Sequence, residues 1–145
     1  MKDILDKNHG FTNEYAFLSN FYPCDIMVGG IIYPSVEHAY QAAKTKDKKD
    51  KKKIAKCKSA GTAKQFGKYV KLREDWDKVK TKVMLSLVAQ KFLKHRELRK
   101  KLISTKDISL VEYNFWKDTY WGVCNGIGQN KLGKILMFVR EKLNN

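Results

Sequence analysis

The fold of this chain is decided by the stretch FLSNFYP (residues 17–23) and its continuation YPSVEHAYQAAK (residues 33–44). Pro34 and Ser35 form a helix start signal, with Ser35 as the predicted N-cap. After that cap, apolar residues recur at helical spacing, which predicts an amphipathic helix to about Thr45. The stretch therefore predicts a loop, a hairpin and the start of a helix.

A second face of the same helix carries Glu37, Gln41 and Lys44 at four- and three-residue steps. A carboxylate, an amide and an ammonium beside aromatic residues can hold a sugar and supply a proton-transfer group. The same spacing also fits a solvated helix face, which is the commoner case for such a pattern. The spacing alone therefore does not establish a site.

Composition predicts one folded domain over residues 1–145, because 43% of the residues are hydrophobic and 12% are aromatic. No apolar run is long enough to cross a bilayer, and residues 1–7 lack the hydrophobic region of a signal peptide. We therefore expect a cytoplasmic protein with no membrane partner. The three cysteines and three histidines are scattered, and no dinucleotide or P-loop fingerprint occurs, so we predict no metal and no cofactor.

The formal net charge is +15, and lysine supplies nearly all of it. Such a charge attracts phosphates, nucleotides or nucleic acid. Arginine, which makes the bidentate contacts of specific nucleic-acid recognition, is scarce. The lysine excess also fits a lysine-biased genome, so nucleic-acid binding stays an open possibility.

The remaining elements follow from local signals. Glycines 29 and 30 separate two β-rich runs and predict a hairpin. A helix is expected to start in the charged run 46–53 and to end at Gly61, and Thr62 is expected to cap a short helix to about residue 70. Further expectations are a strand over 11–15, a helix capped by Asp75, a helix over 98–105, a β-like segment over 108–113 and a closing helix over 132–143. This order predicts an α+β domain dominated by helices, with a small hairpin.

Residues 118–133 form a second informative stretch, DTYWGVCNGIGQNKLG. Its glycines allow a tight loop with unusual backbone angles and close ligand approach. Asn130 stands where the last helix starts and is predicted to cap it, and Trp121 can stack on a base or ribose. Asp118 adds a carboxylate to Glu37, and glycoside cleavage uses such groups. A structural loop with a core tryptophan explains the stretch equally well.

Taken together, these motifs resemble the NADAR family, the family of YbiA-like N-glycosidases. The resemblance covers residues 11–143 and rests on several motifs in the same order. They lie at residues 17–22, 35–44, 76–84, 91–92, 110–112, 118–122 and 128–137. The resemblance implies a compact, mainly helical α+β fold that hydrolyses N-glycosidic bonds. Residues 123–125 depart from the family pattern, which leaves the contacts of that loop open.

The resemblance also assigns roles to residues. It implies a catalytic role for Glu37, Asp118 and Trp121. Tyr40 and Gln41, on the first helix, join the predicted substrate-binding set. The whole predicted substrate-binding set is Ser19, Asn20, Phe21, Tyr40, Gln41, Lys44, Trp76, Gly122, Gly128 and Asn130.

Two substrates follow from the resemblance. One is a phosphoribosylamino-pyrimidine intermediate of riboflavin synthesis, and the other is an ADP-ribosyl adduct on a guanine base of nucleic acid. The competing hypothesis is a non-catalytic module that binds ADP-ribose, NAD or nucleic acid. Glu37 and Asp118 argue against such a module, because both carboxylates repel an anionic ligand. The sequence does not fix the oligomeric state.

Overall fold

The computed structural model describes residues 10–145, which fall into two compact units. Unit 2 contains residues 20–91, and unit 1 contains residues 10–19 and 92–145. Each unit is described by itself, and the expected single domain stays a prediction. Residues 1–7, which carry the signal-peptide argument, and His9 lie outside the described residues.

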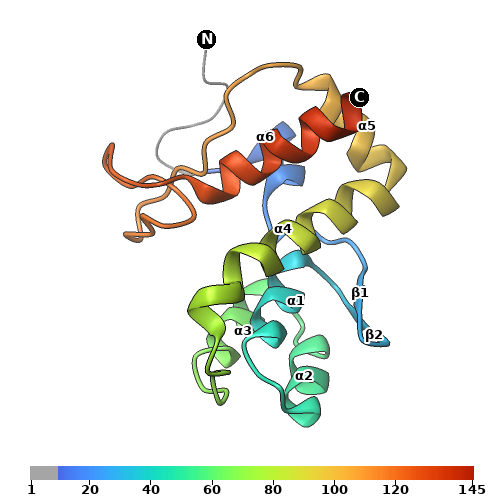
Figure 1. Cartoon of the computed structure of the whole chain (residues 1–145), viewed down its shortest axis with the longest axis vertical. Helices are drawn as coiled ribbons and strands as arrows, with labels where there is room; N and C mark the ends of the chain where they lie inside the picture. Colours follow the sequence, from blue (N-terminus) through green and yellow to red (C-terminus); the bar gives the residue numbers. More distant parts are fainter. Residues whose placement is uncertain (1–9) are drawn as a thin grey trace. The chain divides into compact units, whose positions relative to one another are not determined.

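A two-stranded hairpin opens unit 2, as predicted (Figure 1). Strands β1 (Ile26–Val28) and β2 (Ile31–Tyr33) pair antiparallel, with Ile26 opposite Tyr33. Gly29 and Gly30 join them with φ angles of 57° and 81°. Two successive positive φ angles are typical of the tight turn that matches the twist of a hairpin.

Helix α1 (Val36–Ala43) begins at Ser35, which confirms the predicted N-cap. The Ser35 hydroxyl accepts a hydrogen bond from the backbone N–H of His38 at 3.1 Å and lies 2.7 Å from His38 Nδ1. The other ring nitrogen of His38 lies 3.0 Å from the carbonyl oxygen of Cys57. This buried histidine therefore joins the start of α1 to the chain after α2 (Lys48–Ala55).

Helix α1 packs against both α2 and α3 (Ala60–Phe66). The prediction that Gly61 ends a helix and that Thr62 caps the next one is wrong. The hydroxyl of Ser59 accepts the backbone N–H of Thr62 at 3.0 Å and starts α3, so Gly61 lies inside that helix. A capping bond offsets the cost of one interior glycine, since both are about 1 kcal/mol. Asp75 directly precedes the long helix α4 (Trp76–Lys94), and the lysine-rich α2 is mostly exposed.

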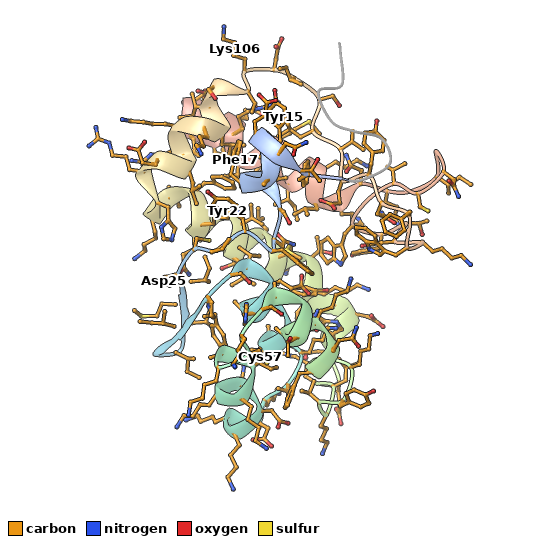
Figure 2. The ribbon with its side chains drawn as sticks, turned by 180° about the vertical axis from the view of Figure 1, so that it is seen from behind. Tyr15, Phe17, Tyr22, Asp25, Cys57 and Lys106 are labelled. Carbon is orange, nitrogen blue, oxygen red and sulfur yellow. The ribbon has the colours of Figure 1, made fainter. Side chains whose placement is uncertain are left out.

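Unit 1 contains the 3₁₀ helix η1 (Asn13–Leu18), α5 (Arg96–Ser104) and α6 (Lys131–Asn144), and α5 packs against α6. The prediction of a strand over residues 11–15 is wrong, because η1 occupies most of that segment. Figure 2 labels Tyr15 and Phe17 on η1, and Phe17 is buried. The β-like segment over 108–113 is reduced to one isolated bridge between Tyr113 and Val123.

The helix-dominated α+β class is confirmed. Tight packing within each unit comes from its buried apolar side chains. In unit 2 these include Ile26, Val36, Ala39, Ile54, Ala63, Met84 and Val88, and in unit 1 Leu18, Phe92, Leu102, Leu110, Leu132 and Leu136. Within residues 10–145, none of the helices combines the length and hydrophobicity required to cross a membrane.

Candidate active site

Glu37 lies in the first turn of α1 and is 7% exposed. Its Oε2 atom accepts a hydrogen bond of 2.6 Å from Gln41 Nε2, one helical turn later. Its backbone N–H donates to the carbonyl oxygen of Asn20 at 3.0 Å, which holds the loop before the hairpin against the helix start. The first turn of a helix favours a negative side chain, and Glu37 occupies such a position in α1.

Gln41 is 3% exposed and has one open acceptor. Its Oε1 atom has no hydrogen-bond partner among the described residues. A side chain at Gly67, directly after α3, would collide with this amide, so only glycine leaves room for Gln41 there. A buried acceptor without a partner costs free energy, which a hydroxyl of a bound substrate would recover.

The ring of Tyr40, on α1, lies next to the ring of Trp76 and to the ammonium group of Lys44. The ring centroids of Tyr40 and Trp76 are 5.2 Å apart at an interplanar angle of 56°. The Nζ atom of Lys44 lies 5.8 Å from the centroid of the Tyr40 ring. Tyr40 is thus held between Trp76 and Lys44, and both rings are buried, at 7% and 6% exposure.

Burial lowers the pKa of Lys44. The nearby carboxylate of Glu37 opposes this shift, whereas the positive charges of Lys64, Lys68 and Lys80 add to it. Three further lysines from α3, the segment after it and α4 therefore contribute to the field at Lys44. These like charges repel one another, and a bound phosphate would neutralise that repulsion.

The other predicted residues of unit 2 support this arrangement. Asn20 Nδ2 donates to the sulfur of Met84 on α4 at 3.4 Å, while Phe21 is 46% exposed. Unit 2 therefore brings together seven of the predicted residues, namely Asn20, Phe21, Glu37, Tyr40, Gln41, Lys44 and Trp76. Their roles in catalysis and binding stay predictions.

In unit 1, Asp118 shapes the loop that carries Trp121. The Oδ1 atom of Asp118 accepts the backbone N–H groups of Tyr120 at 3.1 Å and Trp121 at 2.9 Å. The Asn114 side chain both donates to the backbone carbonyl of Asp118 and accepts its N–H. The rings of Trp121 and Tyr120 meet edge to face, with centroids 4.8 Å apart. One carboxylate oxygen of Asp118 is thus already committed to holding the loop.

The glycines of this loop allow chain segments to approach closely. A side chain at Gly122 would collide with the backbone of Glu112, and one at Gly128, where φ is 152°, would collide with the carbonyl oxygen of Gly122. Ser19, the last residue of unit 1 before unit 2, ends η1 and donates its N–H to Ala16. Unit 1 thus carries the remaining predicted residues, namely Ser19, Asp118, Trp121, Gly122, Gly128 and Asn130.

The prediction that the Asn130 side chain caps the last helix is wrong. Its Oδ1 accepts the N–H of Glu112 and its Nδ2 donates to the carbonyl oxygen of Leu110, both at 3.0 Å. Asn130 has a left-handed backbone, with φ of 51°. The amide can satisfy one donor and one acceptor of the extended segment 110–112 at once, which a helix cap does not provide.

Sequence reasoning missed some residues beside these two groups. Gly67 has no local signal, because its role depends on α1 packing against α3. The dipeptide Asn125-Gly126 does have one, since Asn-Gly is the strongest short hairpin signal. It forms the tip of a tight turn in which Cys124 and Ile127 exchange backbone hydrogen bonds of 2.8 and 3.0 Å.

Comparisons with known proteins place the chain in one family. Residues 7–144 match the model of the NADAR domain. The chain is 36% identical to the N-glycosidase YbiA of Escherichia coli over 99% of the chain and 91% of that protein. It is 40% identical to an N-glycosidase of Nostoc punctiforme over 90% of the chain and 87% of that protein.

A third relative is a longer protein. The chain is 40% identical to a riboflavin biosynthesis protein of Vibrio vulnificus over 95% of the chain, but it spans only 36% of that protein's length. The NMR structure of E. coli YbiA matches with a TM-score of 0.83 and 35% identity over 98% of this chain and 88% of that chain. The chain therefore belongs to the NADAR domain family.

Proposed function

We propose that this chain is an N-glycosidase that cleaves the bond between the C1 carbon of a phosphorylated ribose and the nitrogen of an attached pyrimidine. The buried Glu37 carboxylate, hydrogen-bonded to Gln41 and next to the cation of Lys44, is the observation that carries this proposal. Several relatives are named N-glycosidases, which supports the reaction class. A cytoplasmic location is part of the proposal.

In the proposed reaction, the oxygen of a water molecule bonds to C1 of the ribose while the carbon–nitrogen bond breaks. The electron pair of that bond stays on the nitrogen, which receives a proton, so the products are a free ribose phosphate and an amino-pyrimidine. The transition state resembles an oxocarbenium ion, and a nearby carboxylate stabilises its positive charge. We assign this role, together with proton transfer, to Glu37, and we assign the orientation of its carboxylate to Gln41.

The phosphate of the substrate is proposed to bind at Lys44, where Lys64, Lys68 and Lys80 add positive potential. The buried ring pair Tyr40–Trp76 packs beside Lys44 and holds this part of α1 in place. Neither group requires a cofactor. The riboflavin-biosynthesis name of the Vibrio vulnificus relative supports a phosphoribosylamino-pyrimidine over an ADP-ribosyl adduct.

The direct test offers the purified chain both substrates in separate reactions. One is a phosphoribosylamino-pyrimidine, and the other is an oligonucleotide that carries ADP-ribose on guanine. We expect equal amounts of free pyrimidine and ribose 5-phosphate from the first, and slower release of ADP-ribose from the second. Release of ADP-ribose alone would move the assignment to the nucleic-acid substrate, and no release from either would end the N-glycosidase proposal.

Substitution of Trp121 tests the predicted residues of unit 1. Because Trp121 lies in the loop shaped by Asp118 and is only partly buried, we expect Trp121→Ala to raise the KM about tenfold and Trp121→Phe to raise it less. Thermal unfolding measured alongside the kinetics separates binding from folding. If both variants lose stability but keep a normal KM when folded, Trp121 is a core residue only.

A further inference from the structure

A cavity of about 490 Å³ lies in unit 1, beside the loop that carries Asp118 and Trp121. One wall is formed by residues of the segment 111–115, and the other by Val123, Asn125 and Gly126, with Asn130 at its end. The volume is within the range of sites that bind small molecules. Glu37 and Lys44 belong to unit 2 and do not line this cavity.

The two walls are tied to each other by the backbone. The N–H of Asn114 donates to the carbonyl oxygen of Val123 at 2.9 Å, and the N–H of Val123 donates to that of Glu112 at 2.8 Å. Asn125 and Gly126 have φ angles of 51° and 78°, as in a two-residue hairpin turn. The Asn125 side chain is therefore presented at the cavity by a turn of fixed geometry.

The lining of the cavity has a distinctive chemistry. It combines the rings of Tyr113 and Phe115 with the amides of Asn114, Asn125 and Asn130. No charged side chain occurs among the described residues that line it, although the chain has a net charge of +15. An uncharged cavity with aromatic and amide groups fits a neutral planar ring with hydrogen-bonding edges, and it does not fit a phosphate.

Phe115 offers a stacking surface to such a ring. It is 72% exposed, and its ring meets that of Trp116 edge to face with centroids 5.1 Å apart. The side-chain amides of Asn114 and Asn130 already bond to the backbone, whereas Asn125 stands at the exposed turn. Stacking on Phe115 and an edge contact from Asn125 are the two interactions through which this cavity can hold a heterocycle.

We infer that this cavity binds the free pyrimidine base that the proposed reaction releases. The inference rests on the proposed function for the identity of the ring. Phe115 stacks on the base. The side-chain amide of Asn125 forms hydrogen bonds with the edge of the base, because it can both donate and accept them. Phe115 and Asn125 therefore determine which free base this cavity binds.

The test titrates the ¹⁵N-labelled chain with 5,6-diaminouracil and, separately, with ribose 5-phosphate, and follows the backbone amide signals by NMR. We expect the base to shift the signals of Asn114, Asn125 and Gly126, and ribose 5-phosphate to leave them unchanged. Phe115→Ala should weaken binding of the base about tenfold, the size expected for one lost stacking contact. Asn125→Asp should also weaken it about tenfold, through loss of a donor.

Matched controls separate this site from the surface in general. Asn13→Asp changes an exposed asparagine of the same unit that has nearly the same φ, 54°. Phe138→Ala removes a partly exposed ring from α6 of the same unit, since Phe138 is 47% exposed. Both controls should bind 5,6-diaminouracil like the unmodified chain.

Several results would overturn the inference. These are the absence of shifts over residues 113–126 at millimolar base, and unchanged binding of the base by Phe115→Ala and Asn125→Asp. Turnover is measured on the same unmodified protein. If the chain hydrolyses its substrate but the base does not shift the NMR signals of the residues that line this cavity, the inference fails and the proposed function stands. If the base binds here but neither substrate is hydrolysed, the proposed function fails and the base site stands.

Discussion

Glu37→Gln is expected to lower the turnover number at least about 100-fold while the fold stays intact. An acid–base group typically contributes a factor of this size or more. The substituted amide can still accept the hydrogen bond of Gln41 through its oxygen, which in the unmodified chain is 2.6 Å long. It can no longer carry the negative charge that stabilises an oxocarbenium-like transition state. Steady-state and single-turnover rates with the phosphoribosylamino-pyrimidine measure the loss.

Glu97→Gln is the matched control for this substitution. Glu97 is the second residue of α5, as Glu37 is the second residue of α1, so both carboxylates lie in the first turn of a helix. Glu97 is exposed and lies 3.8 Å from Lys100, a surface pair that contributes little to stability. Glu97→Gln should turn over normally. Near-normal turnover by Glu37→Gln, with a normal thermal transition, would remove Glu37 from the catalytic assignment.

The elements that the sequence predicts correctly depend on contacts between near neighbours. The hairpin over 26–33 needs only two glycines and two short β-rich runs, and the start of α1 needs only Ser35 and the N–H of His38. These signals act within four residues, so a pattern is enough to find them. The spacing of Glu37 and Gln41 likewise predicts that they share one helix face, where a hydrogen bond joins them.

Two of the wrong predictions concern residues whose partners are distant in the sequence. Asn130 looks like a helix cap, but its amide bonds to Leu110 and Glu112, about twenty residues earlier. The segment 108–113 has strand composition, but the described residues give it only the bridge from Tyr113 to Val123 as a partner. A strand requires a second strand to pair with along its length, and amino-acid composition alone does not indicate whether one is present.

Burial within the candidate site was equally hard to predict. The pattern of α1 fits a solvated face for Glu37 and Gln41, yet they are 7% and 3% exposed. Their burial depends on packing of α1 against α3 and on the absence of a side chain at Gly67. Burial strengthens the electrostatic interactions of the Glu37 carboxylate, and this distinguishes a candidate site from a solvated helix face with the same residue spacing.

Lys91 provides the second large expected effect, and it concerns stability. This lysine is 1% exposed, and its Nζ atom lies 5.7 Å from the ring centroid of Tyr22, which Figure 2 labels. Burial lowers the pKa of Lys91 from 10.5 to about 8, and the nearby Cys24 partly opposes that shift. The unfolded chain keeps the ordinary pKa, so between these two values it binds more protons than the folded chain.

Stability must therefore rise with pH over this window. Below about pH 8 both states carry the charge, and the cost of burying it is present in full. As the pH increases toward 10.5 the folded state loses the proton first, and the cost is relieved by about 3 kcal/mol in total. Urea unfolding of the unmodified chain at pH 7, 8, 9 and 10 measures the total slope, and Lys91→Met should lack the part that comes from Lys91.

The thiol of Cys24 requires its own control, because burial raises its pKa and the charge of Lys91 lowers it. A raised thiol pKa makes stability fall as the pH increases, which is opposite in sign to the effect of Lys91. Both chains are therefore compared in a Cys24→Ala background. Methionine keeps most of the aliphatic volume of lysine, so Lys91→Met should be more stable than its parent at pH 7 and nearly equal to it at pH 10. Equal pH slopes in the two chains would mean that Lys91 keeps its ordinary pKa despite its burial.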